Sequence, residues 1–141
     1  MFSIAFLLID DFALMSYSSV SEPLRAANLL SEEKLYEISH ISPFNSYSKS
    51  SGGIEISTFP ISAITKNFDL VIIFAGGDPF KFNDKKTFNW LRKISRRGTI
   101  LGGVSGGTVI LASAGLMNRS RMTVHWEHAE AFMEKWPTLL L

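Results

Sequence analysis

Short apolar runs alternate with helical patterns along this chain. Four runs rich in Ile, Leu, Val or Phe end at Asp, Pro or Gly, as β-strands do; they cover Phe2–Ile9, Tyr36–Pro43, Leu70–Ala75 and Thr99–Val104. The third run has no polar alternation from Leu70 to Phe74, which is typical of a strand covered on both faces. The pattern predicts an α/β fold with a parallel sheet between layers of helices.

Three segments between these strands have helical spacing and predict crossover helices: Ser21–Ser31, Asp84–Arg97 and Gly107–Ala114. For the first of them, Ser19 or Ser21 is the expected cap, and Pro23 falls in the first turn. We find no internal repeat and no interdomain linker. Residues 1–141 are therefore expected to form one domain.

The other segments give weaker patterns. Ile54–Phe59 alternates after the turn Ser50–Gly53 and predicts a short added strand. Arg121–Val124 predicts another short strand, and Glu127–Lys135 predicts a helix. Leu139–Leu141 looks like the opening of a further segment, so we expect the chain to be part of a longer protein.

Composition narrows the classes of function. Of 141 residues, 46% are hydrophobic, as in a globular domain with a sizeable core, and the net charge of +1 is too small to hold DNA or an acidic membrane by bulk electrostatics. The chain has no cysteine, which excludes disulfides, thiolate metal sites and a thiol nucleophile. Its longest apolar run, Ile4–Ile9, is far shorter than the roughly 18 residues of a membrane span. No secretory signal precedes it, so we expect a cytoplasmic protein.

The most informative motif is Gly102-Gly103-Val104-Ser105-Gly106-Gly107, in which an apolar strand runs through a glycine-flanked serine into a helix. Small residues on both sides permit a sharp strand-to-helix turn that lifts the central side chain above the sheet edge. Ser105 is therefore a candidate nucleophile-elbow residue. The alternative interpretation is a glycine-rich turn that only allows close packing.

A second glycine turn, Ala75-Gly76-Gly77-Asp78-Pro79, follows the most apolar strand. Its backbone N–H groups are expected at the same carboxyl edge of the sheet, where open parallel sheets bind ligands. Together the two turns predict an anion or oxyanion pocket, although a turn that only reverses the chain direction would have the same sequence.

Two side chains could assist Ser105. His125 could return to the elbow as a base, and Glu22, expected to open the first helix, could be the acid. A histidine beside Trp126 could equally be a packed, hydrogen-bonded side chain. His125 and His128 have the i, i+3 spacing of helical metal ligands, but no third ligand is evident, so we predict no metal and no cofactor.

The predicted helix Asp84–Arg97 is amphipathic and basic on one face. Its cations are Lys85, Lys86, Arg92, Lys93, Arg96 and Arg97. Such a face is usually solvated; docking against DNA or a neighbouring domain is the alternative interpretation.

The chain also resembles a known family. It is similar to the amidotransferase-like sensor domain at the N-terminus of AraC-type bacterial regulators, within the superfamily of class I glutamine amidotransferases and intracellular-protease-like proteins. The resemblance covers nearly the whole chain and is carried by Phe6–Ile9, Glu22–Asn28, Phe74–Pro79, Gly102–Gly107, Ala114–Leu116 and Thr123–Glu127. The segments Glu22–Asn28 and Thr123–Glu127 are similar to the branch that senses carnitine, glycine betaine and arginine-related metabolites.

This resemblance implies a doubly wound, flavodoxin-like sheet and a lost active site. Catalytic relatives have cysteine at the elbow, and the positions matching their nucleophile, acid and base are Ser105, Glu22 and His125. A serine hydroxyl needs a well-placed base, whereas a thiol ionises readily. The implied role is a non-catalytic effector pocket; its expected lining is Gly76, Gly77, Asp78, Phe80, Ser105, Gly106, His125 and Trp126.

The same resemblance implies three partners: a small-molecule effector, DNA bound through a C-terminal helix-turn-helix module absent from these residues, and a second copy of the chain. A quaternary ammonium effector would favour the aromatic faces of Trp126, Phe80, Phe12 and Tyr17, and its carboxylate could sit on the N–H groups of Gly77 and Gly106. A hydrolase or amidase using Ser105 and His125 is the rival hypothesis. A purely structural module, which predicts a crevice filled by side chains, is the third.

Overall fold

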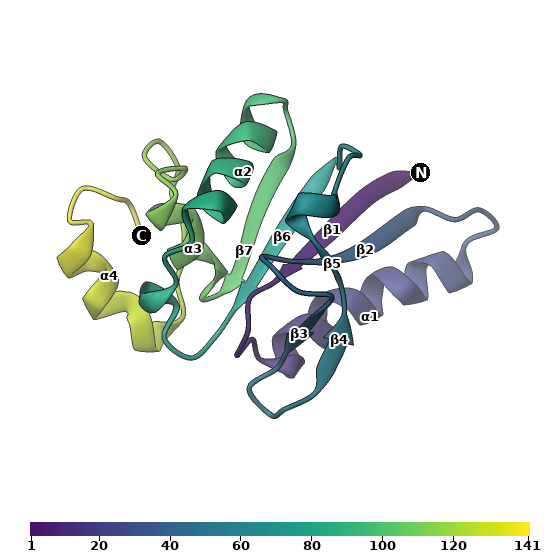
Figure 1. The fold of residues 1–141 in the computed structure, drawn as a ribbon, viewed down its shortest axis with the longest axis horizontal. Coiled ribbons are helices and arrows are strands. Elements are labelled where there is room, and N and C mark those ends of the chain that lie inside the picture. Colours follow the sequence, from purple (N-terminus) through teal and green to yellow (C-terminus); the bar gives the residue numbers. More distant parts are fainter.

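The computed structural model describes all 141 residues and centres on a parallel sheet of five strands in the order β5-β2-β1-β6-β7 (Figure 1). The strands are β1 (Phe2–Leu8), β2 (Tyr36–Ser42), β5 (Phe59–Pro60), β6 (Leu70–Ala75) and β7 (Ile100–Ser105). The helices are α1 (Leu14–Leu30), α2 (Lys85–Arg96), α3 (Gly107–Ser113) and α4 (Ala129–Lys135), with 3-10 turns η1 (Ile61–Ala63), η2 (Pro79–Lys81) and η3 (Trp126–His128). A separate antiparallel hairpin pairs β3 (Tyr47–Lys49) with β4 (Glu55–Ser57).

Both faces of the central strand β1 are buried. Ile4, Phe6 and Leu8 form one apolar cluster, against which α1 packs, whereas Ala5 and Leu7 belong to a cluster shared with α2 and α3. Alternate side chains of one strand thus enter two cores, which explains why the strands are apolar without alternation. A third, smaller cluster lies between the outer side of α3 and α4.

The strand order makes the fold doubly wound, as predicted. From β1 the chain passes through α1 to β2 on one side, and then returns to β6 on the other side of β1. The carboxyl ends of β1 and β6 therefore border the point at which the strand order reverses. In open α/β sheets this crevice is the usual place for a ligand.

The prediction for the first helix is wrong at its N-terminus. Helix α1 begins at Leu14, Pro23 lies inside it, and no side chain caps it. A proline in a helix interior removes one backbone hydrogen bond. The helix nevertheless continues through this residue because Tyr17 and Val20, which precede it, and Leu24, which follows it, all pack on the same apolar cluster.

An aromatic group holds the N-terminal half of α1 on the sheet. The Tyr17 ring contacts the edge of Phe6 at a centroid distance of 5.9 Å, and its hydroxyl is 2.8 Å from His40 Nε2. Burial lowers the pKa of His40 and raises the pKa of Tyr17. Phe12 is fully buried in the same cluster. Tyr17 and Phe12 are therefore core residues, not the pocket aromatics that we expected.

The prediction of one short strand over Ile54–Phe59 is too simple. Residues 55–57 form β4 and pair with the unpredicted β3, whereas Phe59 and Pro60 form β5 and pair with β2. In the C-terminal quarter, the expected strand Arg121–Val124 is reduced to a single bridge between Arg121 and Leu140. The helix expected there divides into η3 and α4.

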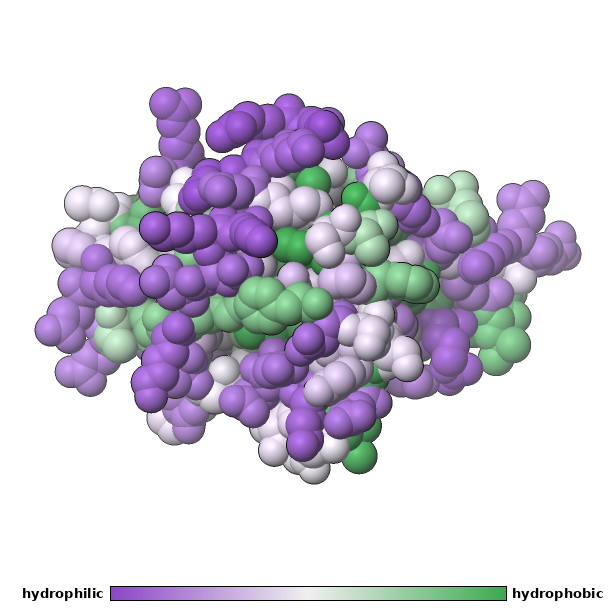
Figure 2. Space-filling model, viewed as in Figure 1, coloured by the Kyte–Doolittle hydropathy of each residue, from purple (hydrophilic) through white to green (hydrophobic).

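Helix α2 lies within the predicted segment Asp84–Arg97, whose two end residues are its caps, and it has the predicted basic face. Asp84 caps it by accepting a hydrogen bond from Thr87 N at 3.0 Å, while Phe88, Leu91 and Ile94 are buried. Its lysines, Arg96 and Arg97 are exposed, whereas Arg92 is half-buried and donates to Ala114 O at 2.9 Å. Figure 2 shows hydrophilic side chains along the top of the view, where α2 lies in Figure 1. None of the helices combines the length and the apolar character that a membrane span requires.

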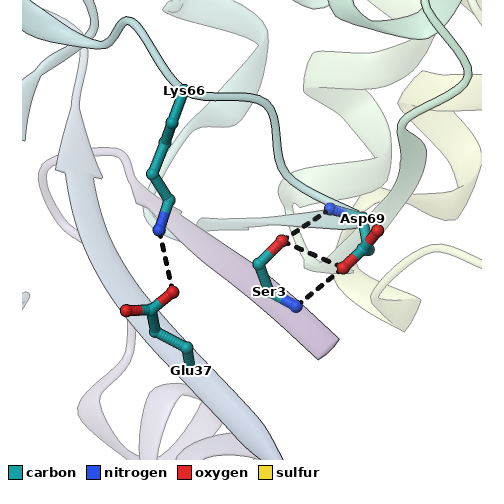
Figure 3. A network of polar contacts seen from close by, with 4 residues as sticks. All are labelled: Ser3, Glu37, Lys66 and Asp69. Carbon is teal, nitrogen blue, oxygen red and sulfur yellow. Dashed lines mark hydrogen bonds and ion pairs between the residues drawn. The ribbon is translucent and has the colours of Figure 1, made fainter. Parts of the chain in front are cut away.

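Two polar contacts tie the amino ends of the strands to the loop before β6 (Figure 3). Asp69 Oδ2 accepts hydrogen bonds from Ser3 N at 2.8 Å and Ser3 Oγ at 3.0 Å, and these bonds lower the pKa of Asp69. Lys66 Nζ lies 2.9 Å from Glu37 Oε2. These contacts fix the sheet at the edge opposite the crevice.

Candidate functional site

The loop after β1 contributes an acidic residue in a strained conformation. Asp11 has φ 73°, and only Asp11 and Ser105 among the non-glycine residues have a positive φ. Its N–H donates to Lys49 O at 2.9 Å. Gly76 lies so close that a Cβ there would be 2.5 Å from Asp11 O. The left-handed backbone of Asp11 is thus held between the hairpin on one side and the β6 loop on the other.

Ser105 occupies an elbow of the predicted kind. Its φ is 55°, and it ends β7 immediately before α3. The turn closes tightly because Gly103 and Gly107 have no side chains: a Cβ on Gly103 would lie 2.5 Å from Thr108 N, and one on Gly107 would lie 2.0 Å from Ile73 O. The glycines are needed for close packing, and the same packing holds Ser105 in a strained backbone conformation. The elbow and the close-packed glycine turn, which the sequence suggested as alternatives, are therefore the same turn.

The two glycine turns meet in a cleft of about 200 Å³. Four of the predicted residues line it together: Gly76, Gly77, Ser105 and His125. The remaining lining residues are Asp11, Ala13, Ser51, Glu127 and His128. The cleft therefore combines two hydroxyls, two imidazoles and two carboxylates at the carboxyl edge of the sheet.

Glu22 and Gly106 are placed differently from our expectation. Glu22 lies in the middle of α1, where its carboxylate pairs with Arg25 at 2.8 Å and its side chain is 58% exposed. It neither opens the helix nor lines the cleft, because α1 starts two turns earlier than predicted. The N–H of Gly106 already donates to Ala75 O at 2.9 Å, so it is not free to receive an effector carboxylate.

Three further candidates lie outside the cleft lining. Asp78 faces a neighbouring cavity, and Phe80 stacks on Trp136 at a centroid distance of 6.1 Å. The Trp126 side chain is 80% exposed and stacks on His125 at 5.7 Å. An aromatic box around Ser105 is therefore not formed in this structure.

The contacts of His125 do not match those of a serine-activating base. Its Nδ1 lies 3.3 Å from Glu127 N and 3.8 Å from Glu127 Oε2, and no hydrogen bond joins the imidazole to Ser105. A general base must be within hydrogen-bond reach of the proton that it takes, and His125 is directed to Glu127 instead. No group of three His, Cys, Asp or Glu side chains is arranged to hold a metal ion.

Sequence reasoning missed a second cavity beside the cleft, of about 280 Å³. Asp11 and Gly76 line both spaces. The other walls come from the segment after β1, from the β2–β3 segment and from the loop after β6, and they include Asp10, Phe44, Tyr47, Asp78 and Lys81. The doublet Asp10-Asp11 at the end of a buried strand was the available sequence signal, because side chains there lie at the ligand-binding edge.

A doubly wound sheet with a glycine-flanked elbow serine over its carboxyl edge defines a class of flavodoxin-like α/β domains. Within that class, residues 2–137 match the DJ-1/PfpI family, and the chain belongs to this family. The predicted resemblance to the intracellular-protease-like superfamily is confirmed.

Two curated relatives are named as regulators. The chain is 42% identical over 137 residues to the HTH-type transcriptional regulator GlxA of Rhizobium meliloti, and 37% identical over 134 residues to the HTH-type transcriptional regulator CdhR of Pseudomonas aeruginosa. These matches cover 96% and 95% of this chain but 42% and 40% of the relatives. The chain thus spans less than half the length of these regulators.

Solved structures support the fold. A crystal structure of an AraC family transcriptional regulator from Pseudomonas putida superposes with a TM-score of 0.85 at 22% identity, over 99% of this chain and 75% of that one. At 22% sequence identity, a TM-score of 0.85 shows only that the two backbones are arranged alike. It confirms the predicted fold class.

Proposed function

We propose that this domain is the effector-sensing part of a cytoplasmic AraC-family transcriptional regulator. It binds a small amino-acid-like or quaternary ammonium metabolite at the carboxyl edge of the sheet, and it acts on a C-terminal helix-turn-helix domain that binds DNA. We further propose that it works as a homodimer, since a twofold protein suits pseudo-symmetric operator half-sites.

One observation carries this proposal: nearly the whole chain matches a part of two proteins named as HTH-type transcriptional regulators, at up to 42% identity. A DNA-binding regulator needs DNA contacts, and this domain has a net charge of only +1. The domain therefore supplies something other than the main DNA contact. A cleft with converging polar side chains is suited to ligand recognition.

The site chemistry agrees with a non-catalytic role. The elbow residue is a serine, the chain has no cysteine, and His125 contacts Glu127 and makes no hydrogen bond to Ser105. A serine hydroxyl without a base is a weak nucleophile. The cleft keeps the shape of a ligand site without the proton transfer that hydrolysis needs.

The proposal is tested by a thermal-shift screen of the chain against carnitine, glycine betaine, dimethylglycine and arginine. A ligand present at 100 times its Kd stabilises the folded state by about 2.7 kcal/mol, which raises the melting temperature measurably. His125→Ala should reduce the shift because this side chain lines the cleft. Glu22→Gln is the matched control and should preserve the shift, since Glu22 lies on the exposed side of α1.

A shift that His125→Ala reduces and Ser105→Ala retains supports a sensor. Silence across the panel, combined with hydrolysis of an ester or amide that Ser105→Ala abolishes, overturns the sensor proposal in favour of an amidase. Footprinting of the full-length regulator on its own promoter, with and without the active compound, tests the coupling to DNA.

A further inference from the structure

Helix α2 presents a strongly positive surface that does not line the Ser105 cleft. We call this surface the basic face, and it consists of the exposed cations Lys85, Lys86, Lys93, Arg96 and Arg97. At 3.6 residues per turn, these positions and Asn89 fall within an arc of about 120° around the helix axis. Phe88, Leu91 and Ile94 lie on the opposite side of the helix, in the core. No apolar and no acidic side chain lies within the arc.

The chain does not neutralise the charge of the basic face. None of its cations takes part in an ion pair, since the ion pairs of the protein join other residues. The only carboxylate in the helix segment belongs to the cap, Asp84, and it accepts hydrogen bonds from Thr87 N and Thr87 Oγ1. Because the whole chain has a net charge of only +1, the residues outside the basic face are net negative. The small net charge therefore conceals one concentrated positive surface.

The charges of the basic face do not serve the stability of the helix. Lys85 and Lys86 occupy the first turn, where the positive end of the helix dipole disfavours cations. Lys93 precedes Arg96 by three positions and Arg97 by four, so like charges meet on the helix surface and repel one another. A solvated helix commonly alternates charges of the two signs. The basic face is instead suited to a partner that carries negative charge.

The composition of the basic face indicates the class of partner. Protein interfaces are anchored by apolar and aromatic side chains, which this face lacks. A helix that binds a membrane surface inserts an apolar face, whereas the apolar face of α2 is buried in the core. Contacts to the phosphates of DNA come from lysine, arginine and other polar side chains, and they need no apolar anchor. Charge complementarity therefore favours the backbone of duplex DNA.

The helix that carries the basic face is fixed in place. Asp84 caps its N-terminus, and Arg92 Nη1 donates to Ala114 O at 2.9 Å, which ties α2 to the end of α3. From Lys85 to Arg96 the helix extends about 16 Å. The phosphates of one DNA strand are about 3.4 Å apart along the duplex axis, so this length spans several of them. The helix needs no ordering when DNA binds.

We propose that the basic face of α2 contacts the phosphate backbone of duplex DNA beside the segment that the helix-turn-helix domain occupies. The inference rests on the proposed function, in which this domain belongs to a DNA-binding regulator. A domain joined to a DNA-bound module meets the neighbouring phosphates at a high effective concentration. The cations of α2, too few to hold DNA tightly alone, therefore add to the affinity of the whole protein, whatever the base sequence.

The salt dependence of DNA binding by the full-length regulator tests this contact. Fluorescence anisotropy on a labelled promoter duplex, between about 50 and 300 mM KCl, compares the wild type with the variant Lys85→Gln/Lys86→Gln/Lys93→Gln. Each phosphate contact contributes about 0.9 to the slope of log K against log salt, so the slope should fall by about 2–3 and the affinity at about 100 mM KCl by about tenfold. The variant should melt at the wild-type temperature, since the three lysines are exposed and unpaired.

Two controls separate a DNA contact from a general effect of charge. Lys34→Gln/Lys49→Gln/Lys135→Gln removes the same charge from exposed lysines on other segments, and it should keep the wild-type slope and affinity. A duplex trimmed to the footprint of the helix-turn-helix domain lacks the flanking phosphates. The wild type and the α2 variant should bind this short duplex equally.

The inference is overturned if the α2 variant and the lysine control have equal affinities and slopes, a result that would favour an acidic protein surface as the partner of the basic face. It is also overturned if the α2 variant loses as much affinity on the trimmed duplex as on the long one. Its failure is distinguishable from failure of the proposed function. A regulator with a metabolite-dependent footprint that the α2 variant leaves unchanged retains the sensor and rejects the DNA contact, whereas a full-length protein that binds no DNA rejects both.

Discussion

Gly107→Ala is the sharpest test of the packing beneath the elbow. A Cβ on Gly107 would lie 2.0 Å from Ile73 O and 2.9 Å from Ile73 C, whereas ordinary contacts start near 3.4 Å. The obstacle is backbone of the central sheet, so no rotamer change can relieve it, and α3 must move away from β6. That movement loosens the apolar cluster to which Ile73 of β6 and Ile110 of α3 both belong.

The expected loss is a balance of two terms. Overpacking costs about 1–3 kcal/mol, with a backbone obstacle at the upper end, and alanine returns up to about 1 kcal/mol through its higher helix propensity. The net loss of about 2 kcal/mol would lower the urea midpoint by about 1 M, for an m-value near 2 kcal/mol per M.

Gly102→Ala is the matched control for this measurement. The same methyl group placed there meets its nearest heavy atom, Ile72 Cγ1, at 4.0 Å. The substitution should be neutral or stabilise the chain by up to about 1 kcal/mol, since alanine loses less backbone entropy on folding. Equal urea midpoints for Gly107→Ala and Gly102→Ala would refute the proposed backbone clash.

Three further predictions concern stability. Burial lowers the pKa of His40, so the unfolded chain takes up a proton at a higher pH than the folded chain. The contribution of neutral His40 to the free energy of unfolding is therefore complete above about pH 6.5 and is lost as the pH falls below that value. The urea midpoint should be lower at pH 5.5 than at pH 7.5, and His40→Gln should reduce this difference. Asp84→Ala should lower the free energy of unfolding by about 1 kcal/mol because it removes the cap of α2, while Asp84→Asn should retain most of the stability. Equal urea midpoints for the two variants would contradict the capping role of Asp84. Ser105→Gly should stabilise the chain by about 0.5–1 kcal/mol because the positive φ favours glycine, and a destabilised variant in thermal melts would show that the Ser105 side chain contributes to folding.

The sheet could be predicted because its central strands, β1 and β6, are covered on two sides. Apolar runs such as Leu70–Ala75 cannot be solvated, so the pattern alone separates them from loops. Strand β3 was missed because it has no such run. Ser48 is buried there through a hydrogen bond to Leu8 O, a contact across 40 positions that local patterning does not reveal.

The candidate site was predictable where chain position alone places a residue at the sheet edge. Gly76, Gly77 and Ser105 follow directly on β6 or end β7, and the structure brings them into one cleft. Glu22 was misplaced because cap signals around Pro23 competed with tertiary packing of the preceding turns, and the packing prevailed. The conformation of Asp11 was not predictable from its neighbours, since it depends on the approach of Gly76 from a distant loop.

The absence of a side chain at Gly107 has a mechanical consequence. Where two elements touch through side chains, a change of rotamer can accommodate a small displacement. At Gly107 no such adjustment is possible, because the backbone of α3 lies directly against the Ile73 carbonyl. The inner side of α3 contacts the sheet, and its outer side carries Val109 against Phe132 of α4. A shift of the elbow on ligand binding would therefore move α3 as a rigid body, and this movement would displace α4 and the residues that follow it.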